Sequence, residues 1–393
     1  MKRPGRILPV IVFSQFAGTS LWFAGNAILP DIQKAWQLGD ASLGWMTSSV
    51  QLGFIAGTFL FAFLTLADRY PGRLIFLICS VIGGFTNLSI IFIDGNLVSL
   101  ITLRFFTGFF LAGIYPVGMK IAAEWYRKGL GKALGYLVGA LVIGTAFPHL
   151  IRGLANDLHW EKVMLYVSGI AITGGVLMYL LVPEGPYKKS SSGFSFKAVI
   201  NIFKEKDFRH AAFGYFGHMW ELYALWTFIP FILLKYAESN HSGFNVSTWS
   251  FVIIGAGALG CVAGGYASKV YGSAKVAFVM LLVSGICCLI SPILFDIPYE
   301  IFMLVMVIWG FTVVADSPQF STLNALTAPK ALIGTGLTIV TSIGFAITIF
   351  SIELLNSLKG LLSHEMLFLL LIPGPVFGLI TLIPLIRKER VSG

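Results

Sequence analysis

Stretches of about twenty apolar residues recur along the whole chain and are separated by short polar breaks. A hydrocarbon core about 30 Å thick is crossed by about 20 residues of α-helix, so each stretch is long enough to span a bilayer. Helices satisfy their own backbone hydrogen bonds inside lipid, which favours helices over open strands. We expect an all-α membrane protein with twelve transmembrane helices, over residues 7–30, 45–66, 73–94, 96–119, 132–153, 163–182, 210–235, 248–267, 274–296, 299–319, 331–356 and 364–386.

The composition agrees with a chain that is surrounded by lipid. Of the 393 residues, 56% are hydrophobic and only 11% are charged, against roughly 25% charged in an ordinary soluble domain. The net charge is +9, but the basic residues form no patch with stacking aromatics, so we expect no nucleic-acid partner. The cysteines lie inside apolar runs without metal-site spacing, and we expect small buried hydrophobes, no metal and no cofactor. They are Cys79, Cys261, Cys287 and Cys288.

Basic residues are distributed unevenly between the two sides of the predicted membrane. If both termini are cytoplasmic, 21 of the 27 Lys and Arg lie in inner segments. The exceptions are Arg104, which lies inside a helix, and the outer residues Lys34, Arg152, Lys162, Lys235 and Lys359. Such an excess of Lys and Arg marks the cytoplasmic side. We therefore expect a multi-pass protein of the cell inner membrane with both termini in the cytoplasm.

The longest polar stretch, residues 183–209, divides the predicted helices into six and six. We expect an N-terminal six-helix bundle over 1–182, a basic cytoplasmic linker over 183–209 and a C-terminal six-helix bundle over 210–393. A short echo supports two repeated halves, since Asp68-Arg69-Tyr70-Pro71-Gly72 follows the second helix and Ser268-Lys269-Val270-Tyr271-Gly272 follows the eighth. Internal repeats of this kind are common in transporters.

Polar residues recur at helical spacing on the first, fourth, seventh and tenth predicted helices. Spacings of three and four place residues on one face of a helix. An ionisable group inside a membrane is costly unless it is paired or hydrated, so such residues are candidates for function. The candidates for contact with a substrate are Gln15, Trp22, Asn26, Arg104, Tyr115, His218 and Trp309.

Several of these candidates have a structural alternative that the sequence leaves open. A fixed charge in helix packing explains Arg104 as well as attraction of an anion does. His218 lies one turn from Glu221, which permits direct coupling, but a hydrated cavity residue without a role is an equal alternative. Large aromatics such as Trp22 also serve as ordinary membrane anchors and packing units.

Glu221 is the first candidate for proton coupling. It lies about eleven residues into its predicted helix, or about 16 Å along it, which is close to half the hydrocarbon thickness. A carboxyl at that depth can be protonated to different extents in the open and closed states of a cavity. Asp316 is the second candidate, although its place near the predicted inner mouth also fits simple interfacial solvation. For Glu221 the alternative is a structural carboxyl bound to its neighbours.

The turn after the second helix carries a family motif. Leu66-Ala67-Asp68-Arg69 and Gly72-Arg73 match Gly-x-Leu-Ala-Asp-Arg-x-Gly-Arg-Lys, although Leu64 replaces the first Gly and Pro71 adds a residue. With two runs of six helices and a basic central loop, the chain resembles the major facilitator superfamily over nearly its whole length. An Arg in the fourth helix followed by small residues, here Arg104, is a second feature of that family.

The resemblance implies that helices one, four, seven and ten line a central cavity. It also implies a conformational latch formed by Asp68, Arg69, Gly72 and Arg73. The run Ala315-Asp316-Ser317-Pro318-Gln319 resembles transporters of small anions, but helices two and eight lack the arginines of nitrate porters. The fifth helix lacks the Gly-Pro pair of the antiporter motif, so antiport is not inferred.

Together these features predict a secondary transporter that acts by alternating access. We expect a monomer that moves a small organic or inorganic anion, with proton-coupled symport as the energy source and another coupling ion as an alternative. A multidrug or metabolite efflux transporter is the rival within transport. A membrane enzyme or a nontransporting sensor is the rival from another class, but no Walker loop, zinc-type His cluster or nucleophile elbow is present, so an enzyme is not expected.

Overall fold

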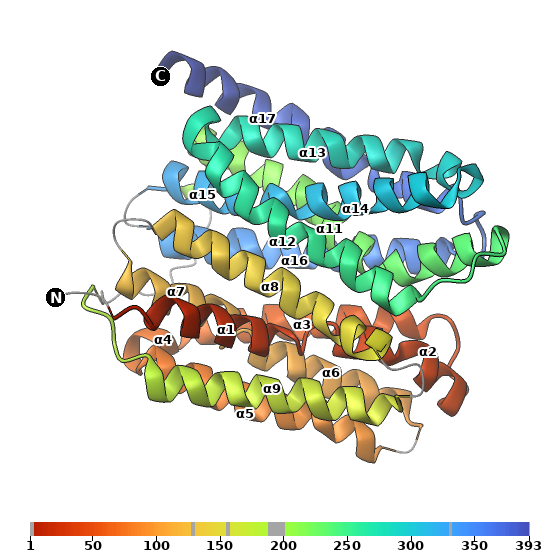
Figure 1. Ribbon diagram of the computed structural model, residues 1–393. Coiled ribbons are helices and arrows are strands. Elements are labelled where there is room, and N and C mark those ends of the chain that lie inside the picture. Colours follow the sequence, from red (N-terminus) through yellow and green to blue (C-terminus); the bar gives the residue numbers. More distant parts are fainter. Residues whose placement is uncertain are drawn as a thin grey trace. The chain divides into compact units, whose positions relative to one another are not determined.

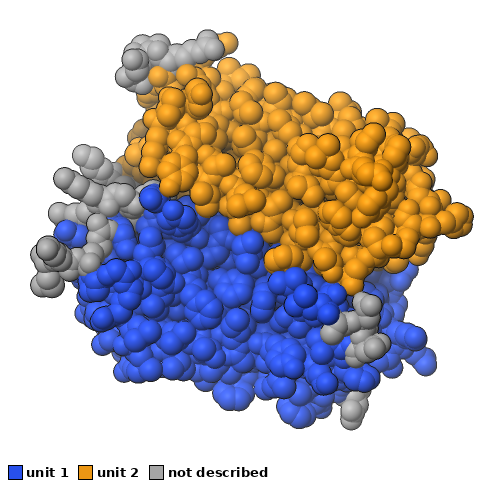
Figure 2. Space-filling model, in the orientation of Figure 1, with its two compact units in different colours: residues 1–193 blue, residues 194–393 orange. Residues whose placement is uncertain are grey.

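The computed structural model describes residues 4–93, 95–126, 130–154, 158–187, 201–329 and 332–392. These residues form helices joined by short turns, and no strand occurs among them (Figure 1). The chain forms two compact units, residues 1–193 and 194–393, which are coloured separately in Figure 2. Eleven helices in the described ranges are long and apolar enough to cross a membrane. With α11 (Lys206–Ser239) they make the twelve spanning helices that the sequence predicts.

Unit 1 contains six spans, of which the first and fourth are interrupted. The first span is α1 followed by α2, and the fourth is α6 followed by α7. An interrupted helix leaves backbone carbonyls without helical partners, and inside a membrane these carbonyls must be bound by other groups. The elements of unit 1 are α1 (Ile7–Thr19), α2 (Ala24–Trp36), α3 (Ser42–Phe63), α4 (Leu66–Arg69), α5 (Gly72–Leu88), η1 (Ser89–Phe92), α6 (Leu97–Leu111), α7 (Tyr115–Trp125), α8 (Leu130–Leu154) and α9 (Trp160–Leu181).

In unit 2 the central helix is α11, which packs against α12, α15, α16 and α17. It is the longest helix, with 34 residues, and among the twelve spans it is the one too polar to pass as an apolar segment. The tenth span is interrupted between α14 and α15. The other elements of unit 2 are α12 (Val246–Tyr271), α13 (Ser273–Ile290), η2 (Ser291–Asp296), α14 (Tyr299–Ala315), α15 (Ser317–Thr327), α16 (Ile333–Leu358), η4 (Leu367–Leu371) and α17 (Pro373–Ser392).

Small residues allow the second and fourth spans of each unit to approach closely. On α6, a Cβ at Gly108 would overlap the Val50 carbonyl of α3. On α14, a Cβ at Gly310 would overlap the Ile253 carbonyl of α12. Glycine removes this obstacle, as is usual where membrane helices pack tightly. The two units therefore repeat one packing arrangement.

The polar stretch between the bundles differs from the expected linker at both ends. Residues 188–200 lie outside the described ranges. The helix expected from 210 begins at Lys206. At the other end the chain packs on the C-terminal end of α7, where Trp125 Nε1 donates to the Pro183 carbonyl at 3.0 Å and Tyr187 N–H donates to the Glu124 carbonyl at 3.0 Å.

Candidate functional site

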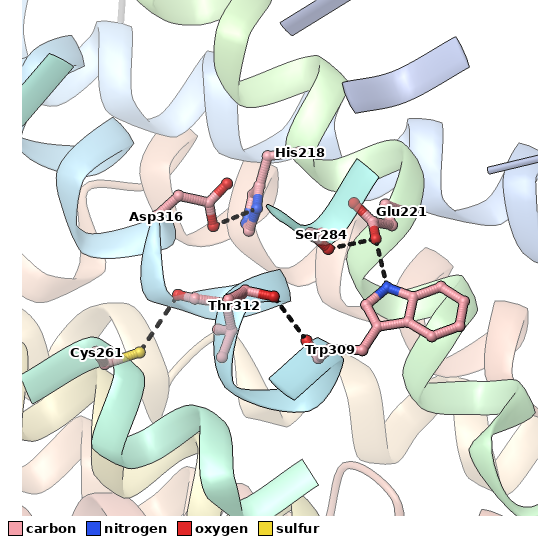
Figure 3. Close-up of polar contacts among 8 residues, drawn as sticks. His218, Glu221, Cys261, Ser284, Trp309, Thr312 and Asp316 are labelled. Carbon is pink, nitrogen blue, oxygen red and sulfur yellow. Dashed lines mark hydrogen bonds and ion pairs between the residues drawn. The ribbon is translucent and has the colours of Figure 1, made fainter. Parts of the chain in front are cut away.

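Unit 2 holds a fully buried carboxyl. It belongs to Glu221 in the middle of α11, and this side chain has no exposed surface. Its Oε1 atom accepts hydrogen bonds from Ser284 Oγ at 2.5 Å and from Trp309 Nε1 at 2.8 Å (Figure 3). It also accepts one from Cys288 Sγ at 3.2 Å. Its Oε2 atom has no hydrogen-bond partner among the described residues. Donors from α13 and α14 therefore bind the carboxyl through Oε1, and Oε2 accepts no hydrogen bond from the described residues.

A second buried acidic group, Asp316, lies on the tenth span and pairs with a residue of α11. Asp316 occupies the break between α14 and α15, and its Oδ1 atom lies 2.9 Å from His218 Nδ1, at ion-pair distance. Both side chains are 1% exposed. The imidazole contacts two aromatic rings, with its centroid 5.8 Å from that of Tyr215 and 5.6 Å from that of Phe320, and these two rings also contact each other at 6.4 Å. This contact is a salt bridge when His218 is protonated.

The helical positions explain why these four side chains meet. His218 and Glu221 are one turn apart on α11, so they lie on the same face. Trp309 and Asp316 are about two turns apart on the tenth span, and they also share a face. Figure 3 shows the two pairs facing each other, with Thr312 between them. The sequence placed all four on polar stripes, and the structure brings them together.

Three buried partners of this cluster were not singled out from the sequence. Ser284 and Cys288 are neutral residues inside an apolar run, and nothing in one sequence distinguishes them from packing residues. Cys288 donates to Glu221, and the Cys261 thiol donates to the Val314 carbonyl at 3.3 Å. The expectation that the cysteines are buried is correct, but these two are also hydrogen-bond donors.

Arg104 forms the corresponding polar centre of unit 1. Its Nη1 atom donates to Asn87 Oδ1 at 2.8 Å and to the Leu21 carbonyl at 3.2 Å. Its Nη2 atom donates to the Leu21 carbonyl at 3.2 Å and to the Trp22 carbonyl at 2.5 Å. Both carbonyls belong to the break between α1 and α2. These contacts support the alternative of a fixed packing charge, and a role of Arg104 in substrate binding stays a prediction.

The remaining candidates of unit 1 make neutral contacts. Trp22 Nε1 donates to Gln51 Oε1 at 3.3 Å, and Asn26 Nδ2 donates to Thr47 Oγ1 at 2.8 Å. Gln15 is buried, and its amide atoms have no hydrogen-bond partner among the described residues. Tyr115 is half-buried at the first position of α7. Their contact with a substrate stays a prediction.

The predicted latch lies at the junction of α4 and α5. Gly72 begins α5, and Arg73 donates to the Tyr179 carbonyl of α9 at 3.4 Å with its guanidinium 5.3 Å from the Tyr179 ring centroid. The side chain of Asp68 lies outside the described part of the chain, and Arg69 is exposed. The conformational role of the four residues therefore stays a prediction.

Known proteins share this fold and part of the sequence. The chain is 25% identical over 166 residues to an uncharacterized MFS-type transporter of Methanocaldococcus jannaschii, covering 40% of this chain and 42% of that protein. It is 28% identical over 146 residues to multidrug resistance protein Stp of Mycobacterium tuberculosis, covering 36% of this chain and 26% of that protein. The chain thus aligns with less than half the length of these relatives.

A solved proton:xylose symporter superposes with a TM-score of 0.74 at 12% identity, covering 97% of this chain and 95% of that one. At this identity the likeness shows the fold alone. A sequence model of the major facilitator superfamily matches residues 11–352, which is most of the chain. The chain therefore belongs to the major facilitator superfamily and, with its twelve spans, is a multi-pass membrane protein.

Proposed function

We propose that this protein is a secondary transporter, not an enzyme, that moves a small solute by alternating access and couples the movement to protons through Glu221. The observation that carries the proposal is the Glu221 carboxyl, which is fully buried, bound through Oε1 to neutral donors and without a partner on Oε2. A buried ionisable group within a spanning helix is a candidate for function, and here it lies in a family built for transport.

Coupling requires that a group binds protons differently in two conformations. Glu221 lies on α11, whereas its donors Ser284 and Trp309 lie on α13 and α14. A movement between any two of these helices would change the set of donors around Oε1. The proton affinity of a carboxyl depends on its hydrogen bonds and its hydration. Helix movement and proton binding are therefore linked at this residue.

Asp316 is the second candidate for the coupling role. Its Oδ1 atom already faces the His218 imidazole, which can supply the compensating positive charge. Glu221 has only the neutral donors of a hydroxyl, an indole and a thiol. The negative charge of ionised Asp316 can therefore be neutralised by protonated His218, whereas the donors around Glu221 carry no positive charge. We assign proton exchange to Glu221 first for this reason.

An anionic substrate, the class that the sequence predicts, depends on Arg104. One observation favours it, because Arg104 Nε has no hydrogen-bond partner among the described residues. Two others weigh against it, since Nη1 and Nη2 already donate to protein oxygens and the side chain has no exposed surface. Arg104 therefore supplies little free donor capacity for an anion.

Efflux is the second candidate function. Aromatic side chains are buried along α11, where Tyr223 contacts Trp226 at 5.3 Å and Phe345 at 5.1 Å between ring centroids. Rings in this number are suited to hydrophobic substrates, and one of the relatives is a multidrug resistance protein. The direction of transport is settled by the orientation of flux in sealed liposomes.

The test of proton coupling is the substitution Glu221→Gln, which keeps the shape of the side chain and removes its titration. We expect the variant to lose accumulation driven by a proton gradient while retaining some exchange of substrate. Glu124→Gln is the matched control, because Glu124 is also a buried carboxyl, 6% exposed, but lies on α7 outside the cluster. If Glu221→Gln accumulates substrate to the wild-type ratio, the proton-coupling assignment is wrong.

A further inference from the structure

The two oxygens of the Glu221 carboxyl have different environments. Oε1 accepts from Ser284, Trp309 and Cys288, which occupies the positions around that atom. Oε2 is buried and has no partner among the described residues, and in Figure 3 it points away from Ser284 and Trp309. A buried carboxyl oxygen without a donor is costly, so a site that keeps one has a partner in some other state. Oε2 is therefore the atom at which a ligand or a proton binds.

The charges around this atom indicate which ligand it accepts. Among the described residues of unit 2, the buried ionisable groups other than thiols and phenols are Glu221, Asp316 and His218, and no Lys or Arg is buried with them. The imidazole faces Asp316 and not Glu221. When Glu221 loses its proton, the cluster therefore gains a negative charge that no fixed cation of unit 2 compensates. A buried charge of this kind requires a partner of opposite charge.

Aromatic rings surround the cluster. The Trp309 ring that binds Glu221 contacts Phe368, with centroids 6.4 Å apart, and His218 contacts Tyr215 and Phe320. Aromatic faces attract cations, most strongly where water is excluded. The aromatic rings of the cluster, together with its lack of a buried Lys or Arg in the described part of unit 2, thus favour a positively charged organic group over an anion.

We propose that the substrate of this transporter is an organic cation whose ammonium or guanidinium N–H group replaces the proton on Glu221 Oε2. This proposal rests on the proposed proton-coupling role of Glu221 and specifies the substrate class of the same site. It replaces the anion as the favoured class.

The exchange conserves charge in the cluster. Protonated Glu221 releases its proton to water, and the resulting carboxylate accepts a hydrogen bond from the nitrogen of the arriving cation through Oε2. Ser284, Trp309 and Cys288 keep their bonds to Oε1 throughout. Because proton and substrate occupy the same oxygen in turn, they cannot be carried together on it. The expected mode is therefore exchange of substrate for proton, and not symport.

Matched ligands that differ only in charge test the substrate class. Tryptamine, tryptophol and indole-3-propionate share an indol-3-yl-ethyl group and end in an ammonium, a hydroxyl and a carboxylate, and aliphatic and benzylic sets extend the panel. Each compound is added to the full-length purified protein in weakly buffered detergent solution with a pH indicator. We expect the amines to bind and to release about one proton for each molecule bound. Their affinity should fall up to tenfold for each unit of pH below the midpoint, as mass action requires of competitors.

Variants separate the site from general damage. Glu221→Gln should bind amines without releasing protons, or not bind them, while Glu124→Gln should behave as the wild type. Wild-type elution on gel filtration shows that Glu221→Gln is folded. Binding of the carboxylate, binding of the alcohol accompanied by proton release, or no binding of any amine in the panel overturns the proposed class.

Failure of the class is distinguishable from failure of the proposed function. If the carboxylate compounds bind while Glu221→Gln still loses proton-driven accumulation, the substrate class is wrong and the coupling assignment stands. If Glu221→Gln retains proton-driven accumulation, the coupling assignment fails whatever the substrate is.

Discussion

The polar centres of the two units are built from corresponding spans but carry different ionisable groups. In unit 1 the fourth span provides Arg104, which binds the interrupted first span and Asn87 of the third. In unit 2 the first span provides Glu221, which is bound by Trp309 of the fourth span and Ser284 of the third. The same three spans thus meet in each unit, with a fixed cation in one and a carboxyl in the other.

The shared backbone packing makes this comparison meaningful. Gly108 and Gly310 each let the fourth span of its unit touch a carbonyl of the second. The difference between the centres therefore comes from their side chains and from the first span, which is interrupted in unit 1 and continuous as α11 in unit 2. Arginine stays charged in proteins, so the unit 1 centre cannot exchange protons. A carboxyl can, so we expect the unit 1 centre to control stability and the unit 2 centre to control pH dependence.

The largest expected effect concerns the pH dependence of transport. The wild-type rate should change with pH in liposomes, and Glu221→Gln should give a rate that no longer follows the titration. Arg104→Lys, which keeps the charge of the unit 1 centre, should lower the rate but leave the shape of the profile unchanged. A profile altered by Arg104→Lys and unaffected by Glu221→Gln would reverse the roles of the two centres.

Loss of the guanidinium should mainly reduce stability. Arg104→Ala leaves the carbonyls of Leu21 and Trp22 and the Asn87 side chain without their donor in a buried place. An unsatisfied buried polar group costs about 1–3 kcal/mol, so we expect a loss of about 3 kcal/mol or more. Thermal unfolding in detergent, followed by tryptophan fluorescence, measures it.

Arg104→Lys should recover part of this loss, because one ammonium can reach some of the acceptors but cannot match the planar group. Unchanged melting temperatures for both variants would rule out the role of Arg104 at the break. Wild-type flux and substrate affinity in both would exclude any part for it in transport.

Removing one donor from Glu221 should have a smaller effect. Ser284→Ala and Trp309→Phe each delete one of the bonds to Oε1, worth about 1 kcal/mol for a typical hydrogen bond. This corresponds to a displacement of the midpoint of the pH profile by up to about one pH unit. Ser250→Ala is the matched control, since that buried hydroxyl bonds only to the Val246 carbonyl on its own helix. If Ser250→Ala displaced the midpoint of the pH profile as much as Ser284→Ala does, a specific role of the donors to Glu221 would be excluded.

Much of the unit 2 cluster could be predicted from the sequence because its charged members are rare within apolar runs. His218 and Glu221 share a face of one helix, as Trp309 and Asp316 share a face of another, and periodicity alone places each pair. Ser284 could not be predicted, because a serine in an apolar run looks the same whether it faces a carboxyl or its own helix.

The helix breaks were predictable to different degrees. The breaks in the fourth and tenth spans each precede a proline, Pro116 and Pro318, at the start of the following helix, and such prolines are a known signal of helix starts. The first span breaks over Ser20-Leu21-Trp22-Phe23, which contains no proline or glycine. Its stabilising partner, Arg104, is distant in sequence, so only the structure shows why the chain is interrupted there.

The smallest expected effects come from ion pairs at the ends of the two units. In unit 1, Arg152 binds Asp31 through two contacts of 2.9 Å, with the side chains 22% and 28% exposed. In unit 2, Lys388 pairs with Asp207 Oδ2, and the two side chains are 69% and 39% exposed. A bidentate ion pair that is less exposed to solvent stabilises a protein more than a single exposed contact does. Exposed ion pairs contribute about 0–1 kcal/mol.

A double-mutant cycle with Arg152→Ala and Asp31→Ala should give a coupling energy of about 1 kcal/mol, and one with Lys388→Ala and Asp207→Ala should give less than half of that. The unit 1 coupling should also survive higher salt better, because its charges are less exposed to screening ions. Both cycles are measured by thermal unfolding in detergent at two salt concentrations. Equal couplings would show that burial at these ends does not distinguish the units, so the asymmetry between them would be confined to the centres at Arg104 and Glu221.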